Sequence, residues 1–261
     1  MGPPPRSCVA AVVQLKQSSL RNRLLRALAP EDFALVGPHL EQVMLPRGKV
    51  LIEPNQPIEH VIFPESGVAS VVALNSDSRP VEIGIVGREG LVGPSIVLGV
   101  DRTPHQSFFQ MEGAGYQIPI RHMIRALEAS PCLHDLLLRY IHVLMVQTAA
   151  TAMSNGDSVL SERMARWLLM CHDRVDSDEL ALTHEFLSLM LAVRRPGVTE
   201  AIHLLEGTGI IRARRAHITI LDRERLEETA GDSYGVPEAE YERLIPMPDG
   251  SGASHVRLPG L

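Results

Sequence analysis

The sequence has little cysteine, and this limits the kinds of protein it can encode. Its 261 residues include three cysteines, Cys8, Cys132 and Cys171, which lie far apart along the chain. An odd, scattered set of this kind fits a reducing compartment and no disulfide framework, so we expect a cytoplasmic protein. An iron–sulfur cluster normally needs four thiolate ligands, and a cysteine-ligated cluster is therefore excluded.

Long uninterrupted hydrophobic runs are also missing. The longest, such as Leu136–Leu138 and Val143–Val146, are interrupted within a few residues, whereas a membrane-spanning helix needs about 20 predominantly apolar residues. Residues 1–19 hold three consecutive prolines and no convincing cleavage site, which predicts a flexible leader rather than a signal peptide. The prolines and the Gly-Ser-Gly-Ala-Ser stretch of residues 231–261 predict a C-terminal tail that is loose at its end, and leave open whether residues 234–245 pack on the body. We expect no membrane contact.

Enzyme motifs are missing as well. The sequence has no Walker-type loop, no Rossmann fingerprint and no His-Glu-x-x-His motif. Three adjacent residues that could suggest a metal, Cys171-His172-Asp173, point in different directions if they lie on a helix. The sequence therefore predicts a protein that is not an enzyme, with no metal site and no identified cofactor.

The overall charge is mildly acidic. A formal net charge of −6 argues against a generally basic surface for nucleic acid, but one local basic surface can sit on an acidic body. The length allows a sizeable core and two domains.

Residues 20–128 change from a helical pattern to short β-branched runs. After residues 22–40, which have helical periodicity, the runs are broken by turn sequences such as Pro-Arg-Gly and Asn-Ser-Asp-Ser. Short strands at such intervals predict an antiparallel sandwich or barrel. Two further strands, SFFQMEG and AGYQI, are expected to form a pair with Gly113 at their turn.

Residues 129–154 predict one long helix of roughly 35 Å, which Asn155-Gly156-Asp157 should end. Its apolar and small residues step by four, three, four and three, the spacing of a coiled-coil seam. This favours a homodimer helix, although a helix packed on its own domain has the same pattern. The seam consists of Leu137, Ile141, Leu144, Thr148 and Thr151.

Residues 155–230 predict a third section with two short helices joined by a tight turn. Its centre reads LTHEFLSLMLAVRRPGVTEAIHLLEGTGII, residues 182–211. Thr183 can cap the first helix, Ala192-Val193 fits the turn, and Pro196 is acceptable in the first turn of the second helix. Two helices so joined form a helix-turn-helix unit, whose second helix enters the major groove of DNA.

The polar side of this second helix carries candidate base-reading residues. Arginine matches the O6 and N7 atoms of guanine with its planar fork, and the residues on this side are Arg194, Arg195, Thr199 and His203. Two short β runs follow and predict a wing whose basic residues would reach phosphates, namely Arg212, Arg214, Arg215 and His217. Residues 182–223 contain six arginines and four acidic residues, a net charge of +2 on an acidic chain.

With these elements in place, residues 22–230 resemble the Crp/Fnr superfamily of bacterial transcription regulators. The most specific parts are SERMARWLLM, the 182–211 stretch and the hairpin after it. The resemblance implies an α+β fold with an N-terminal antiparallel β-roll (jelly-roll-like), a long dimerisation helix and a C-terminal winged helix-turn-helix. It also implies that Thr183 and His184 contact DNA phosphates, and that Arg195, with Val198 and Thr199 after it, reads bases.

The same resemblance raises the question of a cyclic-nucleotide pocket. Family members that bind cyclic nucleotides use a Gly-Glu sequence and a downstream Arg-Ser or Arg-Thr. Here the matching residues are Glu89 and the pair Arg102-Thr103, with longer spacing and a proline after the threonine. These departures favour another effector or none, with a cyclic nucleotide as the alternative.

Together these features predict a homodimeric transcription regulator that binds an inverted repeat in double-stranded DNA, with RNA polymerase as a further candidate partner. The alternative outside DNA binding is a sensory module whose winged helix contacts another protein. Acidic or apolar residues at the start of the second helix would favour that alternative, and Arg194-Arg195 favours DNA.

Overall fold

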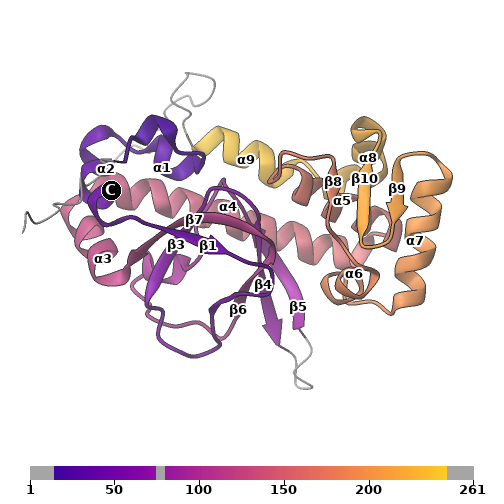
Figure 1. The fold of residues 1–261 in the computed structure, drawn as a ribbon, viewed down its shortest axis with the longest axis horizontal. Helices are drawn as coiled ribbons and strands as arrows, with labels where there is room; N and C mark the ends of the chain where they lie inside the picture. Colours follow the sequence, from indigo (N-terminus) through magenta and orange to yellow (C-terminus); the bar gives the residue numbers. More distant parts are fainter. Residues whose placement is uncertain (1–14, 75–79, 246–261) are drawn as a thin grey trace, which may run out of the picture.

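The structure is a computed structural model that describes residues 15–74 and 80–245. Within them, the N-terminal half folds into two antiparallel sheets that form a β-roll (Figure 1). One sheet has the order β1-β7-β3 and the other β2-β6-β4-β5. The strands are β1 Glu41–Leu45, β2 Val50–Ile52, β3 His60–Pro64, β4 Val68–Leu74, β5 Pro80–Val86, β6 Gln106–Met111 and β7 Gly113–Pro119. The predicted antiparallel roll is confirmed.

The last two strands of the roll do not form the hairpin that the sequence suggested. Strand β6 pairs with β2 and β4, whereas β7 pairs with β1 and β3. Gly113 therefore marks the place where the chain passes from one sheet to the other. A Cβ atom at Gly113 would lie 2.1 Å from the carbonyl oxygen of Ser66, so glycine is needed here for close backbone approach rather than for a turn.

Short helices cover one end of the roll. They are η1 Gln17–Ser19, α1 Arg23–Ala27, α2 Pro30–Val36, η2 Gly37–His39, η3 Pro94–Ile96 and α3 Ile120–Ala129. Asn22 caps α1 and anchors it to the roll, because its side chain accepts from Leu25 N and donates to the carbonyls of Pro64 and Gly90. Leu20 is 3% exposed. Residues 15–19 of the predicted leader also pack on the body, since Leu15 contacts the core and Gln17 Nε2 donates to the carbonyl of Leu28 at 2.8 Å. Residues 1–14 lie outside the described residues.

Helix α4, Pro131–Asp157, runs along the length of the molecule (Figure 1). The hydroxyl of Ser130 caps it by accepting from Leu133 N at 3.1 Å. Asn155-Gly156-Asp157, expected to end the helix, is its last turn, because the backbone bonds continue to Ser158 N.

By length and composition α4 could cross a membrane, since it has 27 residues and contains an 18-residue window with a mean hydropathy of 1.3. The uninterrupted apolar runs of the sequence are too short to indicate this, because polar residues divide them. Core helices pass the same test, and α4 packs into the core of its own chain through Leu133, Leu137 and Tyr140. Its buried Gln147 accepts from Ile85 N of strand β5 at 2.9 Å. These contacts bury one face of α4 in its own chain, whereas 28% of its most apolar window is buried in all.

The C-terminal half forms a winged helix-turn-helix. Its elements are α5 Leu160–His172, β8 Glu179–Leu180, α6 His184–Met190, α7 Arg195–Gly207, β9 Ile211–Arg214, β10 His217–Ile220 and α8 Arg223–Ala230. The three strands form a small antiparallel sheet in the order β8-β10-β9. The predicted fold class, with its roll, long helix and winged helix-turn-helix, is confirmed.

The two halves share one core. Val68, Val72 and Ile85 of the roll are buried in the same cluster as the side chains of α5, α6 and α7. At this junction Glu82 of β5 accepts a hydrogen bond from Nε1 of Trp167 at 2.5 Å. The β-roll therefore packs directly against the C-terminal half.

Residues 234–245, whose packing the sequence left open, are folded onto the body. After η4 Gly231–Ser233 they form helix α9 Val236–Leu244, which lies along α4 and near α1 (Figure 1). Tyr241 and Ile245 are buried in the core of the roll. These two buried side chains attach the short helix to the core. The composition of the segment, rich in proline and acidic residues, gave no indication of this packing. Residues 246–261 lie outside the described residues.

Candidate nucleic-acid interface

Helices α6 and α7 are joined by a four-residue turn. Thr183 caps α6, since its hydroxyl accepts from Phe186 N at 3.2 Å. Ala192 in the turn has φ 52°, a left-handed conformation that reverses the chain sharply. Helix α7 begins at Arg195 with Pro196 as its second residue, where a missing N–H costs nothing. The local signals in the sequence thus correspond to the observed helix-turn-helix.

Helix α7 has one buried and one exposed face. Val198, Ala201, Ile202 and Leu205 are buried in the core, whereas Arg194, Arg195 and His203 are exposed and Thr199 is half-buried. Val198, taken from the resemblance as a base-reading residue, is 0% exposed. Its side chain holds α7 on the domain and cannot reach a base, so that assignment is wrong.

The exposed residues near the start of α7 are linked to α6. Arg195 pairs with Glu185 at 2.8 Å, and both side chains are mostly exposed. An exposed pair of this kind is worth little and exchanges readily for another partner. His184 Nδ1 lies 3.2 Å from Thr199 Oγ1, so the start of α6 and the exposed side of α7 form one continuous surface.

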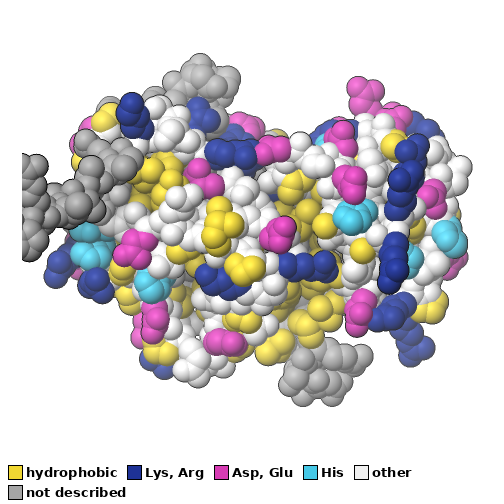
Figure 2. Space-filling view, in the orientation of Figure 1, with side chains coloured by type: hydrophobic (Ala, Val, Ile, Leu, Met, Phe, Trp, Pro, Cys, Tyr) yellow, Lys and Arg dark blue, Asp and Glu magenta, His cyan; other side chains and the backbone are white. Residues whose placement is uncertain are grey.

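The wing extends this surface. Strands β9 and β10 pair from Ile211 to Ile220, with Ala216 at φ 62° in the turn between them. The exposed wing residues are Arg212, Arg214, Arg215 and His217. Figure 2 shows a column of basic side chains over β9 and α7, which are arginines because this part of the sequence has no lysine. Arg223 is not part of it, because it turns inward to Asp173 at 2.7 Å.

Two residues that support this unit were not identified from the sequence. Arg163 of α5 donates to the carbonyl of Leu191 in the turn at 2.5 Å. Arg47, in the loop between β1 and β2, lies 5.8 Å over the ring of Phe186 in α6. Both contacts join elements that are far apart in the sequence, so no local pattern signals them.

The predicted effector residues do not come together. Arg102 pairs with the neighbouring Asp101 at 3.1 Å on an exposed loop, and the hydroxyl of Thr103 accepts from His105 N. Glu89 is paired with Arg174 at 2.8 Å and lines a cavity whose lining does not include Arg102 or Thr103. The long spacing noted in the sequence is the physical reason, because it places the arginine in a separate loop.

The predicted dimer seam is largely used within the chain. Leu137 is 1% exposed and Ile141 9% exposed, and both pack in the core of the roll with Leu144 beside them. Thr148 is exposed and Thr151 half-buried. The exposed apolar and small residues of α4 lie on a neighbouring stripe formed by Leu138, Met145, Ala149, Ala152 and Met153.

Comparison with known proteins identifies one domain and the overall fold. Residues 162–229 match the Crp-like helix-turn-helix domain. No curated protein matches the chain. Among solved structures, FixK2 from Bradyrhizobium japonicum is similar with 15% identity and a TM-score of 0.64, over 74% of this chain and 98% of that chain.

Two further structures have the same fold. The CRP-family transcriptional regulator TTHB099 from Thermus thermophilus is 20% identical, with a TM-score of 0.59 over 74% of this chain and 97% of that chain. The c-di-GMP-responsive global regulator CLP from Xanthomonas campestris is 15% identical, with a TM-score of 0.59 over 74% and 99%. The chain thus carries a Crp-like helix-turn-helix domain and has the fold of Crp/Fnr regulators. This match to a family of regulators agrees with the expectation that the chain is not an enzyme.

Proposed function

We propose that the protein is a sequence-specific DNA-binding transcription regulator of the Crp/Fnr type. The observation that carries the proposal is the exposed pair Arg194-Arg195 at the start of α7, opposite a fully buried face of the same helix. In this role Arg194, Arg195, Thr199 and His203 read base edges in the major groove. Phosphates are bound by Thr183, His184, Arg212, Arg214, Arg215 and His217.

We further propose that the protein acts in the cytoplasm as a homodimer on an inverted repeat, with RNA polymerase as a further partner. Two recognition helices of a dimer must lie about 34 Å apart to read successive turns of DNA. Any effector bound by the roll would act by changing the relative position of the two recognition helices.

Selection of bound DNA from a random-sequence pool, without added ligand, tests the proposal directly. We expect an inverted repeat whose half-sites are one helical turn apart. Enrichment of a single half-site would contradict the dimer. No enrichment with or without added cyclic nucleotide would favour the alternative in which the winged helix contacts a protein.

Two substitutions separate base reading from phosphate binding. Arg195→Ala should weaken binding to the selected operator by about 1–3 kcal/mol and relax specificity at one base pair. Arg214→Ala should weaken binding to all sequences alike and reduce the salt dependence. Binding isotherms at several salt concentrations measure both effects. The control is Arg125→Ala, at an exposed position of α3. Identical behaviour of the two variants across sequences would show that these roles are wrong.

The dimer interface is proposed on the exposed stripe of α4 instead of the buried seam. Leu138, Met145 and Ala152 are spaced by seven residues, as in a coiled coil. Met145 is 65% exposed. Met145→Glu should therefore produce monomers and reduce operator affinity at least tenfold, because two charges would face each other in an apolar contact.

The matched control is Val236→Glu, since Val236 is 59% exposed on a different helix. Sedimentation or light scattering reports the oligomeric state of both variants. A Met145→Glu protein that remains dimeric at micromolar concentration would place the interface elsewhere.

A further inference from the structure

A cavity of about 580 Å³ lies between the roll, helix α4 and helix α9. This size is within the range of about 300–1,000 Å³ for small-molecule sites. Helix α9 closes one side of it and lies beyond residue 229, where the matched helix-turn-helix domain ends. Five arginines line the cavity, namely Arg21, Arg23, Arg26, Arg88 and Arg174.

The arginines differ in how firmly they are held. Arg174 is 7% exposed and locked to Glu89 at 2.8 Å, which makes this pair part of the structure. Arg21 and Arg88 instead share the carboxylate of Asp176, which is 58% exposed. Their hydrogen bonds hold the pKa of Asp176 at about 2. An exposed carboxylate can be exchanged for another anion at small cost.

Arg23 also has unused hydrogen-bonding capacity. Its Nη2 binds Glu242 at 2.6 Å, and its guanidinium lies 4.5 Å over the ring of Tyr241. Its Nε is buried and has no hydrogen-bond partner among the described residues. A buried donor without a partner is costly, so an acceptor that enters the cavity would be favoured here.

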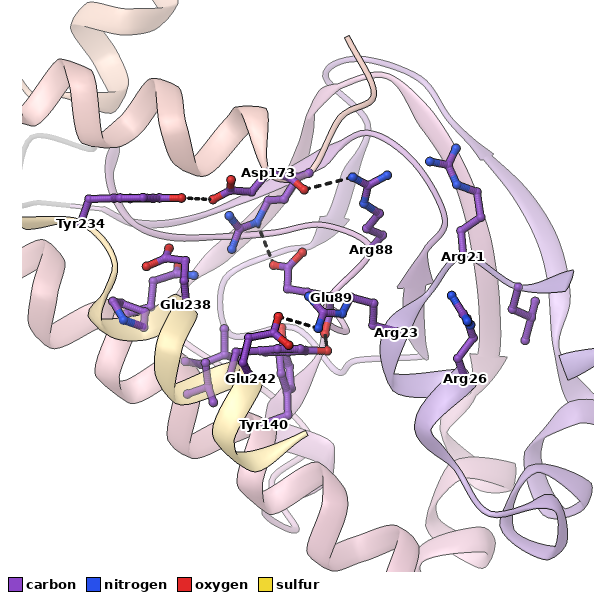
Figure 3. A pocket seen from close by; sticks show the side chains of 17 residues that line it. Arg21, Arg23, Arg26, Arg88, Glu89, Tyr140, Asp173, Tyr234, Glu238 and Glu242 are labelled. Atoms are coloured by element: carbon purple, nitrogen blue, oxygen red, sulfur yellow. Dashed lines mark hydrogen bonds and ion pairs between the residues drawn. The ribbon is translucent and has the colours of Figure 1, made fainter. Parts of the chain in front are cut away.

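The cavity has walls of opposite charge. Figure 3 shows Arg21, Arg26 and Arg88 on the side of the roll and Glu238 and Glu242 on helix α9. Guanidinium groups bind phosphate oxygens in pairs, whereas carboxylates accept from N–H groups. A molecule with phosphate at one end and N–H donors at the other satisfies both walls.

We propose that this cavity binds a small phosphorylated molecule with N–H donors at its far end, the chemistry of a nucleotide, and that Arg21 and Arg88 turn to its phosphate from Asp176, which does not itself line the cavity. The site is separate from Arg102 and Thr103, which do not line it. Asp176 belongs to the loop after α5, whereas Arg21 and Arg88 belong to the roll. A bound ligand therefore breaks the contact of Asp176 with Arg21 and Arg88 between the two halves. The consequence for DNA binding rests on the proposed function.

Calorimetric titration of the full chain with inorganic pyrophosphate, GTP and ATP tests the site without DNA. We expect pyrophosphate and at least one nucleotide to bind. Arg21→Met should weaken both about tenfold or more, as expected for the loss of one charged hydrogen bond to the phosphate, and Arg125→Met outside the cavity should have no effect. Asp176→Asn should tighten binding several-fold, because it removes the competing carboxylate.

A second variant tests the far end. Glu238→Gln keeps the bond to Gly235 N that caps α9, yet it removes a negative acceptor. It should weaken the nucleotide and leave pyrophosphate unchanged. If pyrophosphate binds and neither nucleotide does, the proposed recognition of N–H donors by the acidic wall is overturned. The site itself is overturned if no probe binds at millimolar concentration, or if the Arg21→Met and Arg125→Met proteins bind the probes equally.

A change at the junction of the two halves on ligand binding can be followed separately by fluorescence. Trp167 is the single tryptophan of the chain and lies at this junction. Saturating ligand should change its fluorescence. A ligand that binds with no change in Trp167 fluorescence overturns the coupling. A protein that binds ligand but no DNA sequence overturns the proposed function and leaves the site intact.

Discussion

Replacing Arg174 with methionine is expected to lower the free energy of unfolding by about 3–5 kcal/mol, the cost of breaking a buried ion pair. Arg174 Nε donates to Glu89 at 2.8 Å, and Nη1 donates to the carbonyl of Met170 at 2.6 Å. Methionine fills similar space but leaves the Glu89 carboxylate, which is 16% exposed, without its cation. Urea unfolding of the full chain measures the change.

The double variant Glu89→Gln with Arg174→Met serves as the control. It leaves no buried charge without a partner, and removal of both charges of such a pair is often nearly neutral. We therefore expect it to recover most of the lost stability, which gives a coupling free energy between the two residues. If Arg174→Met lowers the free energy of unfolding by less than about 1 kcal/mol, water solvates the Glu89 carboxylate as well as Arg174 does.

The helix-turn-helix could be predicted because its signals are local. The cap at Thr183, the turn at Ala192 and the proline at position 196 act within a few residues of where they stand. Val198 was misassigned for a different reason. Its spacing from Ile202 and Leu205 already placed it on the apolar face, and the position carried over from the resemblance contradicted that pattern.

Helix α4 shows what periodicity cannot determine. Its sequence holds two apolar stripes one residue apart, one through Leu137 and Ile141, the other through Leu138 and Met145. A stripe that packs on its own roll and one that faces solvent have the same spacing. Only the tertiary structure shows that the first is buried and the second exposed.

The cavity had no signal in the sequence. Its arginines come from residues 21–26, 88 and 174, and its acidic wall comes from a segment whose packing the sequence left open. Burial of Tyr241 and Ile245 holds that segment in place. Contacts between such distant parts of the chain follow from packing of the whole fold and not from any local pattern.

Glu82 is a buried carboxyl at the junction of the two halves. Burial raises its pKa to about 7, against the lowering effect of hydrogen bonds from Ser70 and Trp167 and of the charges on Arg166 and Arg174. The hydrogen-bond geometry fits a protonated acid. Ser70 Oγ lies 2.8 Å from Glu82 and 2.5 Å from Gln110 Oε1, and its single proton can serve only one of two acceptors.

If Glu82 holds its proton, it donates to Ser70 and Ser70 donates to Gln110, so each polar atom has a partner. Between pH 4.5 and about 7 the folded state then keeps a proton that the unfolded state releases. The free energy of unfolding must therefore fall as pH rises through this interval, by about 3 kcal/mol. Unfolding followed by Trp167 fluorescence at pH 5, 6, 7 and 8 measures the slope.

Glu82→Gln separates this contribution from those of the other titrating groups. Glutamine keeps the shape of the neutral acid, can accept from Trp167 and can donate to Ser70, but it cannot ionise. Relative to wild type, the variant should have little effect at pH 5 and be more stable by about 3 kcal/mol at pH 8. The Cys171 thiol nearby does not interfere, because its ordinary pKa of 9.0 already lies above this pH range and burial raises it further. If wild type and variant have parallel stability curves from pH 5 to 8, Glu82 is already ionised in the folded protein, and the junction between roll and DNA-binding half does not respond to pH through this residue.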